Sequence, residues 1–126
     1  MILLDTSVLV DALTGPRRSA PALRRAFARH ERVVLPTLVL YEWWRGPRTP
    51  EELAEQEAIF PAEHVVPFGT EDAARAAALY RTVPRARGRE LDLAIAATAL
   101  SQDAVLWTLN VADFADIPGL TVGKPR

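Results

Sequence analysis

Short continuous apolar runs alternate along the chain with longer segments in which apolar residues recur every three or four positions. The short runs are rich in Val, Ile and Leu, and they occupy residues 2–4, 33–35, 65–66, 105–107 and 120–122. Continuous runs of this length are typical of strands that are covered on both faces, because half-exposed strands alternate apolar and polar residues. The pattern therefore predicts four or five buried strands.

The longer segments predict helices, beginning with one that runs through residue 13. The other predicted helices cover residues 19–30, 37–45, 49–60, 70–83 and 89–101. Thr49, Pro50 and Glu52 have the form of a capping box with proline in the first helical position. Thr70 is expected to cap its helix, with two acidic residues following it in the first turn.

Strands that alternate with helices predict a central parallel sheet with right-handed crossovers and helices on both faces. The fold class is therefore α/β. A chain of 126 residues has the length of one domain, and we expect residues 1–126 to form a single domain. Ligands of such sheets bind at the carboxyl ends of the strands.

Two aspartates are expected at that edge of the sheet. Asp5 directly follows the first predicted strand, and Asp113 follows the strand at residues 105–107 after a short loop. Thr6 and Ser7 come next to Asp5 and are expected to cap the first helix, with their hydroxyls facing the same crevice.

Two further acidic residues lie on apolar helices. Asp92 is in the first turn of the helix at residues 89–101, and its face carries only Ala96 and Ala99, so this helix can approach the sheet closely. Glu42 lies within the apolar helix at residues 37–45, between aromatic and aliphatic neighbours. Four converging carboxylates would form a pocket suited to a hard divalent cation.

Each acid also has a simpler interpretation when it is taken alone. Asp5 would serve as a helix cap, and Asp92 would complement the helix dipole. Glu42 would pair with Arg45 on the surface, and Asp113 would end a turn. Spacing along the chain does not choose between these interpretations and convergence of the four.

The composition of the chain excludes several kinds of site. The chain has no cysteine, which excludes disulfides, thiolate catalysis and zinc–thiolate sites, and its net charge of -1 gives no overall field that attracts nucleic acid. It has no apolar stretch long enough for a signal peptide or a membrane span. We therefore expect a soluble cytoplasmic protein.

Taken together, four segments of the chain resemble the PIN-domain family, and specifically its VapC-type toxin ribonucleases. The matching segments span nearly the whole chain in the family's order; they are residues 5–11, the helix around Glu42, residues 92–99, and residues 108–114 with 117–120. One departure is that Arg89 and Glu90 precede Asp92 where the family often has small or apolar residues.

This resemblance implies a three-layer α/β/α fold and Mg²⁺- or Mn²⁺-dependent endoribonuclease activity. It implies metal binding by Asp5 and Asp92, with Asp113 and Glu42 completing the catalytic site. It also implies support by hydrogen bonds from a further set of polar residues, namely Thr6, Ser7, Thr108 and Asn110. As partners it implies an RNA substrate, a cognate antitoxin and a second copy of the chain in a homodimer.

The RNA backbone must also be bound. Arg85, Arg87 and Arg89 lie just before Asp92 and are the best placed cluster for phosphates, although a solvated loop explains them equally well. The two predicted helices at residues 37–45 and 49–60 are expected to form the groove for the antitoxin.

Other readings of the same acids remain. A phosphoryl-transfer enzyme of the haloacid dehalogenase type needs a second aspartate where Ser7 stands, and a receiver domain needs a lysine at the end of the last strand, whereas Lys124 lies in the tail. A PIN-fold module that binds RNA or protein without turnover is the alternative from another class.

Overall fold

The apolar run at residues 2–4 forms the central strand of a parallel sheet. In the computed structural model, which describes residues 1–126, this strand, β1 (Ile2–Leu4), pairs with β2 (Val33–Val34) on one side and β3 (Val105–Trp107) on the other. β4 (Val122–Gly123) extends the sheet beyond β3, so the order is β2-β1-β3-β4 with every pair parallel. The predicted α/β class with a four-stranded parallel sheet is confirmed.

The strand predicted at residues 65–66 is reduced to an isolated bridge between Pro36 and Val66. The Val66 N–H donates to the Leu35 carbonyl, and its own carbonyl accepts from Thr37. The pairing ends here because helix α3 (Thr37–Arg45) begins directly after the bridge and the short helix η1 (Ala62–His64) ends just before it, so the segments on either side of the bridge are not both extended.

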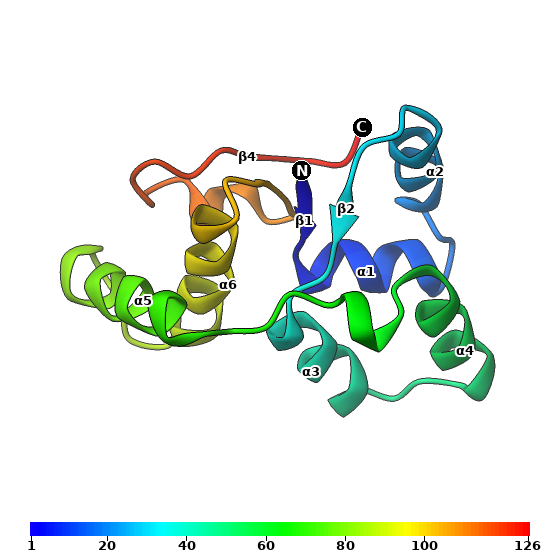
Figure 1. Cartoon of the computed structure of the whole chain (residues 1–126), viewed down its shortest axis with the longest axis horizontal. Coiled ribbons are helices and arrows are strands. Elements are labelled where there is room, and N and C mark those ends of the chain that lie inside the picture. Colours follow the sequence, from blue (N-terminus) through cyan, green and yellow to red (C-terminus); the bar gives the residue numbers. More distant parts are fainter.

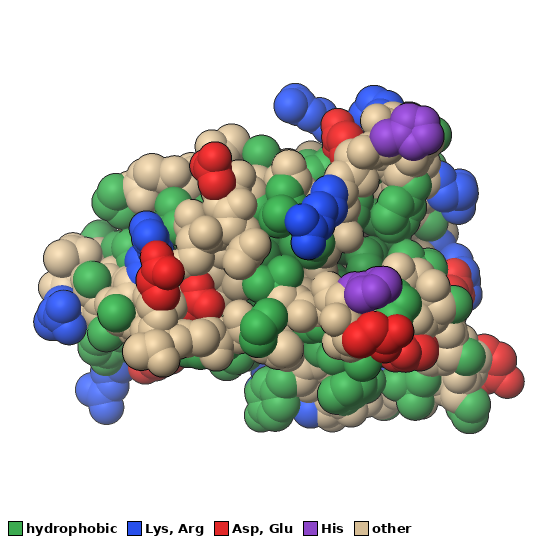
Figure 2. Space-filling model, in the orientation of Figure 1, with side chains coloured by type: hydrophobic (Ala, Val, Ile, Leu, Met, Phe, Trp, Pro, Cys, Tyr) green, Lys and Arg blue, Asp and Glu red, His purple; other side chains and the backbone are tan.

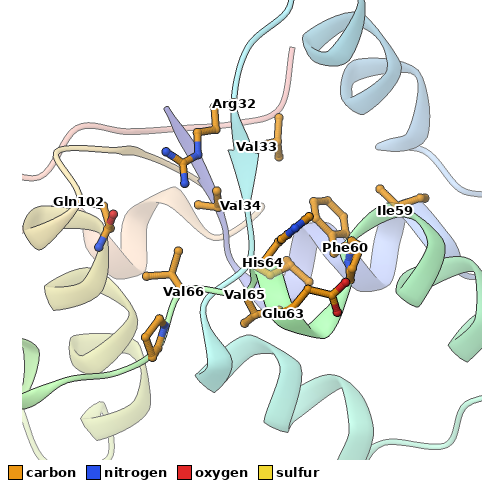
Figure 3. Close-up of a pocket in the computed structure, with 13 residues that line it drawn as sticks. Arg32, Val33, Val34, Ile59, Phe60, Glu63, His64, Val65, Val66 and Gln102 are labelled. Carbon is orange, nitrogen blue, oxygen red and sulfur yellow. The ribbon is translucent and has the colours of Figure 1, made fainter.

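A cavity of about 580 Å³ lies between β2 and this segment. Figure 3 shows Arg32 and Gln102 on one side of it and Ile59 and Phe60 on the other. Most of the residues that line the cavity come from β2 and from the segments on either side of Phe60 and Val66.

Six α-helices and two short 3₁₀ helices surround the sheet. They are α1 (Thr6–Leu13), α2 (Ala20–Ala28), α3 (Thr37–Arg45), α4 (Pro50–Ile59), η1 (Ala62–His64), α5 (Thr70–Thr82), α6 (Glu90–Ser101) and η2 (Val111–Phe114). In Figure 1, α5 and α6 lie to the left of β1 and β2, whereas α2 and α4 lie to the right. None of the helices combines the length and the hydropathy needed to span a bilayer.

Local capping chemistry was predicted correctly at one helix and wrongly at two. At α4 the Glu52 N–H donates to Thr49 Oγ1 (3.1 Å), and the Thr49 N–H donates to the Glu52 carboxylate (2.8 Å), as a capping box requires. At α5 the cap is Gly69 rather than Thr70, because the Asp72 carboxylate accepts the Gly69 N–H (2.8 Å). Asp5, rather than a hydroxyl residue, occupies the cap position of α1.

Two helices bring apolar faces close to the sheet. On α6, Ala96 and Ala99 are completely buried, which agrees with the close approach that their small size allows. On α3, Trp43 is completely buried while the adjacent Trp44 is exposed. Because neighbouring side chains on a helix point in different directions, α3 presents one indole to the core and one to solvent.

Candidate metal and active site

The β1 strand places Asp5 at the carboxyl edge of the sheet, where its side chain is buried. The backbone N–H of Asp5 donates to the Trp107 carbonyl of β3 (2.9 Å), which fixes the residue between two strands. Although Asp5 is the N-cap residue of α1, its side chain makes no capping hydrogen bond. Its carboxylate is therefore directed to other partners, and the interpretation of Asp5 as a cap alone is wrong.

Those partners are two hydroxyl groups. Ser7 Oγ donates to Asp5 Oδ2 at 3.0 Å, and Thr108 Oγ1 donates to the same oxygen at 2.7 Å. Ser7 Oγ accepts the Leu109 N–H (3.1 Å), and Thr108 Oγ1 accepts the Asn110 N–H (3.0 Å). The amides occupy hydroxyl lone pairs, which leaves the hydroxyl protons for Asp5. Oδ1 of Asp5 has no hydrogen-bond partner in the protein and stays available to a ligand.

Glu42 reaches the same region from α3. Its Oε1 accepts the Thr6 hydroxyl at 2.6 Å, which ties α3 to the start of α1. Its Oε2 pairs with the Arg45 guanidinium at 3.3 Å, as the surface interpretation proposed. Glu42 thus has one partner, Thr6, at the start of α1 next to Asp5, and a second partner, the exposed Arg45, on its own helix.

Asp92 shows that the acids are close enough to interact. Burial is the largest cause that raises the pKa of the Asp92 carboxyl, which reaches about 6. The next causes, in falling order, are the negative charges of Asp5, Glu42 and Asp113. Arg89 opposes the rise in this pKa, with the smallest effect of the five. Helix α6 therefore brings Asp92 into the negative potential of the three other predicted acids.

Asp113 lies on η2 and is exposed. Its backbone N–H donates to the Asn110 carbonyl (3.0 Å), which holds the turn that carries it. Asn110 makes hydrogen bonds there through its backbone groups only, donating to Thr108 Oγ1 and accepting from the Asp113 N–H. The predicted support from Thr6, Ser7 and Thr108, in contrast, corresponds to hydroxyl bonds on Glu42 and Asp5.

These residues offer oxygen atoms only, which is the donor set that Mg²⁺ and Mn²⁺ prefer. No three acidic or histidine side chains are gathered tightly enough to ligate one ion together. Mg²⁺ commonly keeps several waters and is held through one or two carboxylates, so an open arrangement of this kind suits it. The free Oδ1 of Asp5 and the charge crowding at Asp92 both fit a divalent cation.

The three arginines predicted to bind RNA behave differently from one another. Arg85 and Arg87 are exposed, and their side chains have no hydrogen bond or salt bridge within the protein. Arg89 instead pairs with Asp116, a residue that the sequence did not single out. The two partners are 27 positions apart, so no local pattern signals their contact.

The surface around the sheet carries no single basic patch on the face shown in Figure 2, where Lys and Arg side chains are interspersed with Asp and Glu. This agrees with the net charge of -1. Contact with a polyanion on this protein therefore depends on local groups beside the acids rather than on the overall field.

The parallel sheet, with acids grouped at its carboxyl edge, defines an α/β protein with a candidate cation site. A model of the PIN domain family matches residues 2–120, and the chain belongs to this family. The predicted resemblance is thereby confirmed.

Individual proteins agree with this assignment. Ribonuclease VapC19 of Mycobacterium tuberculosis is 39% identical over 124 residues, covering 95% of this chain and 97% of that protein. The structure of VapBC-5 from M. tuberculosis, a member of the VapBC family of toxin–antitoxin systems, matches with a TM-score of 0.62 and 26% identity over 98% of this chain and 96% of that one. The DNA-bound VapBC structure from Salmonella typhimurium matches with a TM-score of 0.74 and 23% identity over 99% and 98% of the two chains.

Proposed function

We propose that this protein is a metal-dependent endoribonuclease, the toxin of a toxin–antitoxin pair, and that residues 1–126 act as one PIN domain in the cytoplasm. The observation that carries the proposal is the geometry of Asp5, which is buried at the carboxyl edge of the sheet with one oxygen held by two hydroxyls and the other free. Burial, followed by the charges of Asp5, Glu42 and Asp113, raises the pKa of Asp92, which supports the proposal. The similarity to Ribonuclease VapC19 over nearly the whole of both chains supports RNA as the substrate.

Asp5, Asp92 and Asp113 are the proposed metal ligands, in that order of support. At least one of them is proposed to act through a bound water, because the three are not gathered tightly enough to ligate one ion directly. A bound Mg²⁺ or Mn²⁺ supplies positive charge for a phosphate oxygen and lowers the pKa of a water in its coordination shell. Asp5 is the best prepared of the three, since both of its hydroxyl donors bond to one oxygen and leave the other free. The residues that hold Asp5 are neutral, so its full charge remains for the cation.

Glu42 is proposed to accept a proton from the attacking water. Thr6 holds one of its oxygens, and Arg45 approaches the other from the solvent side. A carboxylate that is oriented by a hydrogen bond, next to the phosphate to be cleaved, has the position required of a general base. The expected products carry a 5′-phosphate and a 3′-hydroxyl.

Replacement of Asp5 tests the proposal most directly. We expect Asp5→Asn to abolish Mg²⁺- or Mn²⁺-dependent cleavage of RNA while the circular dichroism spectrum is unchanged, because the amide keeps the shape but loses the charge. Asp103→Asn is the matched control, since Asp103 is exposed, lies past the end of α6 opposite to the turn that carries Asp92, and has φ 51, a conformation that asparagine tolerates.

The two variants also separate catalysis from simple binding. Wild-type cleavage by a folded Asp5→Asn protein would sink the mechanism. A wild-type chain that binds Mn²⁺ in calorimetry and binds RNA without cleaving it would establish the module without turnover instead.

An antitoxin segment is the proposed protein partner. An apolar groove of about 300 Å³ lies between α1, α2 and α4, with Leu13, Leu23, Phe27 and Ile59 among its lining residues. We propose it as a second candidate for this segment, and the groove between α3 and α4 stays a prediction. Coexpression with the neighbouring gene tests the partner, and failure of the two products to copurify would count against the toxin assignment.

A homodimer is also proposed for the isolated chain. Tyr41 and Trp44 on α3 are about half exposed and offer apolar surface for self-association. Sedimentation of the purified protein over a range of concentrations tests this proposal, and a monomer at all concentrations would contradict it.

A further inference from the structure

Arg89 is the most heavily engaged arginine side chain in the protein. Its Nη1 donates to the Pro84 carbonyl (3.0 Å) and to Asp116 Oδ2 (3.0 Å). Its Nη2 donates to the Asp113 carbonyl (2.8 Å) and to Asp116 Oδ1 (2.8 Å). All four N–H bonds of the two terminal nitrogens are therefore used inside the protein, and the contact with Asp116 is bidentate.

These four bonds join segments that the chain itself does not hold together. Arg89 is the N-cap residue of α6, three positions before Asp92. Asp113 belongs to η2, and Asp116 lies two residues after the end of that element. Arg89 thus connects the start of the helix that carries one proposed metal ligand to the turn that carries another.

The Asp113 carboxylate is not what Arg89 binds. The guanidinium contacts the backbone carbonyl of Asp113, and its charge is matched by Asp116. In this arrangement the turn is fixed while the charge of the Asp113 side chain is left free. Consistent with that, the pKa of Asp116 is lowered by its hydrogen bond with Arg89, so this carboxylate is firmly ionised.

We infer that Arg89 and Asp116 form a clasp that positions Asp113 relative to Asp92 and so sets the affinity for the divalent cation. This inference rests on the proposed function of the acidic site. It assigns to Arg89 a role different from the phosphate contact expected from the sequence, because the terminal N–H groups that would bind a phosphate are occupied.

The geometry also predicts which substitutions of Arg89 and Asp116 weaken the binding of Mn²⁺. Lysine keeps the positive charge of Arg89, but it cannot hold both oxygens of Asp116 and two backbone carbonyls at once. Asp116→Asn leaves Arg89 in place and removes the charge of its partner. If the clasp acts by geometry, Arg89→Lys and Asp116→Asn weaken Mn²⁺ binding alike.

The experiment measures Mn²⁺ binding by calorimetry and hydrogen exchange of the amides in residues 111–117, using the full chain. In both variants we expect Mn²⁺ affinity to fall about tenfold and exchange in this segment to accelerate. In cleavage assays, the Mn²⁺ concentration for half-maximal rate should rise while the rate at saturating Mn²⁺ stays within about twofold of wild type. A general loss of folding would lower the saturating rate as well.

Arg29→Gln is the matched control, because Arg29 also binds a carboxylate and a backbone carbonyl, those of Glu31 and Arg126, but near the opposite end of the strands. It should change neither Mn²⁺ affinity nor exchange in residues 111–117. Unchanged Mn²⁺ affinity in Arg89→Lys and Asp116→Asn would overturn the clasp.

A phosphate contact has a different signature. If Arg89 binds a phosphate, Arg89→Gln should reduce the slope of log binding constant against log salt concentration for RNA by about one, and Mn²⁺ affinity should be unchanged. That result would also overturn the clasp. The wild-type chain could also bind Mn²⁺ without cleaving RNA, while both variants bind Mn²⁺ more weakly as expected. That outcome would contradict the proposed function and leave the clasp in place.

Discussion

The two halves of the acidic site are held in place by different means. The strand half consists of Asp5, which is buried at the end of β1 and held by the hydroxyls of Ser7 and Thr108. The other half, called the loop half after the turn that carries Asp113, consists of Asp92, which is half-buried in the first turn of α6, and Asp113, which is exposed on η2. The ion pair of Arg89 and Asp116 joins these two segments.

Both halves keep their carboxylate charges available. Neutral hydroxyl donors hold the buried aspartate, where a fixed cation would have neutralised it. In the loop half a cation is used, but its charge is matched by Asp116, which lies outside the set of proposed ligands. The comparison suggests that the strand half is rigid and that the loop half tunes cation affinity.

The largest effect is expected from breaking the strand half at Thr108. Thr108→Val has nearly the same shape but removes a donor to Asp5 and the acceptor of the Asn110 N–H. We expect RNA cleavage to fall about 10- to 100-fold and the free energy of unfolding to fall by about 1–3 kcal/mol. Rates at saturating Mn²⁺ and urea denaturation measure the two effects.

Thr98→Val is the control for this substitution, since Thr98 is equally buried but its hydroxyl bonds only to the Ala94 carbonyl of its own helix. It should leave the cleavage rate unchanged. Equal rates for Thr108→Val and wild type would show that the hydroxyl does not hold Asp5 for catalysis.

A smaller effect, on RNA binding, is expected from changing the two arginines that precede the loop half. Arg85 and Arg87 have no partners in the protein, in contrast to Arg89, and remain the predicted phosphate contacts. Reversing both charges should lower the salt slope of RNA binding by about two and weaken binding at low salt. Fluorescence anisotropy at several salt concentrations measures the slope, and an unchanged slope removes both residues from the contact.

The smallest effect concerns stability and pH at Asp92. Its pKa in the folded protein is about 6, above the ordinary value of 3.8. The folded state therefore binds more protons than the unfolded state between these values, and the free energy of unfolding of the metal-free protein falls as pH rises through this window. The unfavourable charge is half present at pH 6 and is fully present by about pH 8.

Asp92→Asn should consequently stabilise the metal-free protein at pH 8 by about 1 kcal/mol, a value reduced from the full shift because partial exposure screens the charges. At pH 4 it should have little effect. Urea denaturation in the presence of a chelator at both pH values measures the difference. Destabilisation at pH 8 would mean that the crowding of charges at Asp92 is weaker than the structure indicates.

The parts of the fold that depend on neighbours in the chain could be predicted from sequence. The capping box at Thr49 depends on residues three positions apart, and the buried strands are marked by continuous apolar runs. The strand predicted at residues 65–66 is reduced to one bridge, because the segment it would pair with turns into helix α3 directly after Pro36. The prediction that Thr70 caps α5 was wrong, because the Asp72 carboxylate accepts the N–H of Gly69, which is the cap residue.

The residues of the site also fall into those that the sequence could place and those that it could not. Asp5 could be placed at the sheet edge because it ends a strand, and the alanine face of α6 indicated the approach of Asp92. The hydroxyl of Thr108 and the carboxylate of Asp116 find their partners 103 and 27 positions away. Such pairings depend on the finished topology, and no spacing in the sequence specifies them.

The position of β1 at the centre of the sheet has a consequence for the order of assembly. One of its two neighbours, β3, is made only after about a hundred further residues, and Thr108 follows directly after β3. Contacts between such distant segments form late, when most of the chain has been synthesised. Asp5 emerges first from the ribosome, yet it acquires its Thr108 partner among the last. The nascent chain therefore carries an incomplete acidic site until translation has passed Asp113.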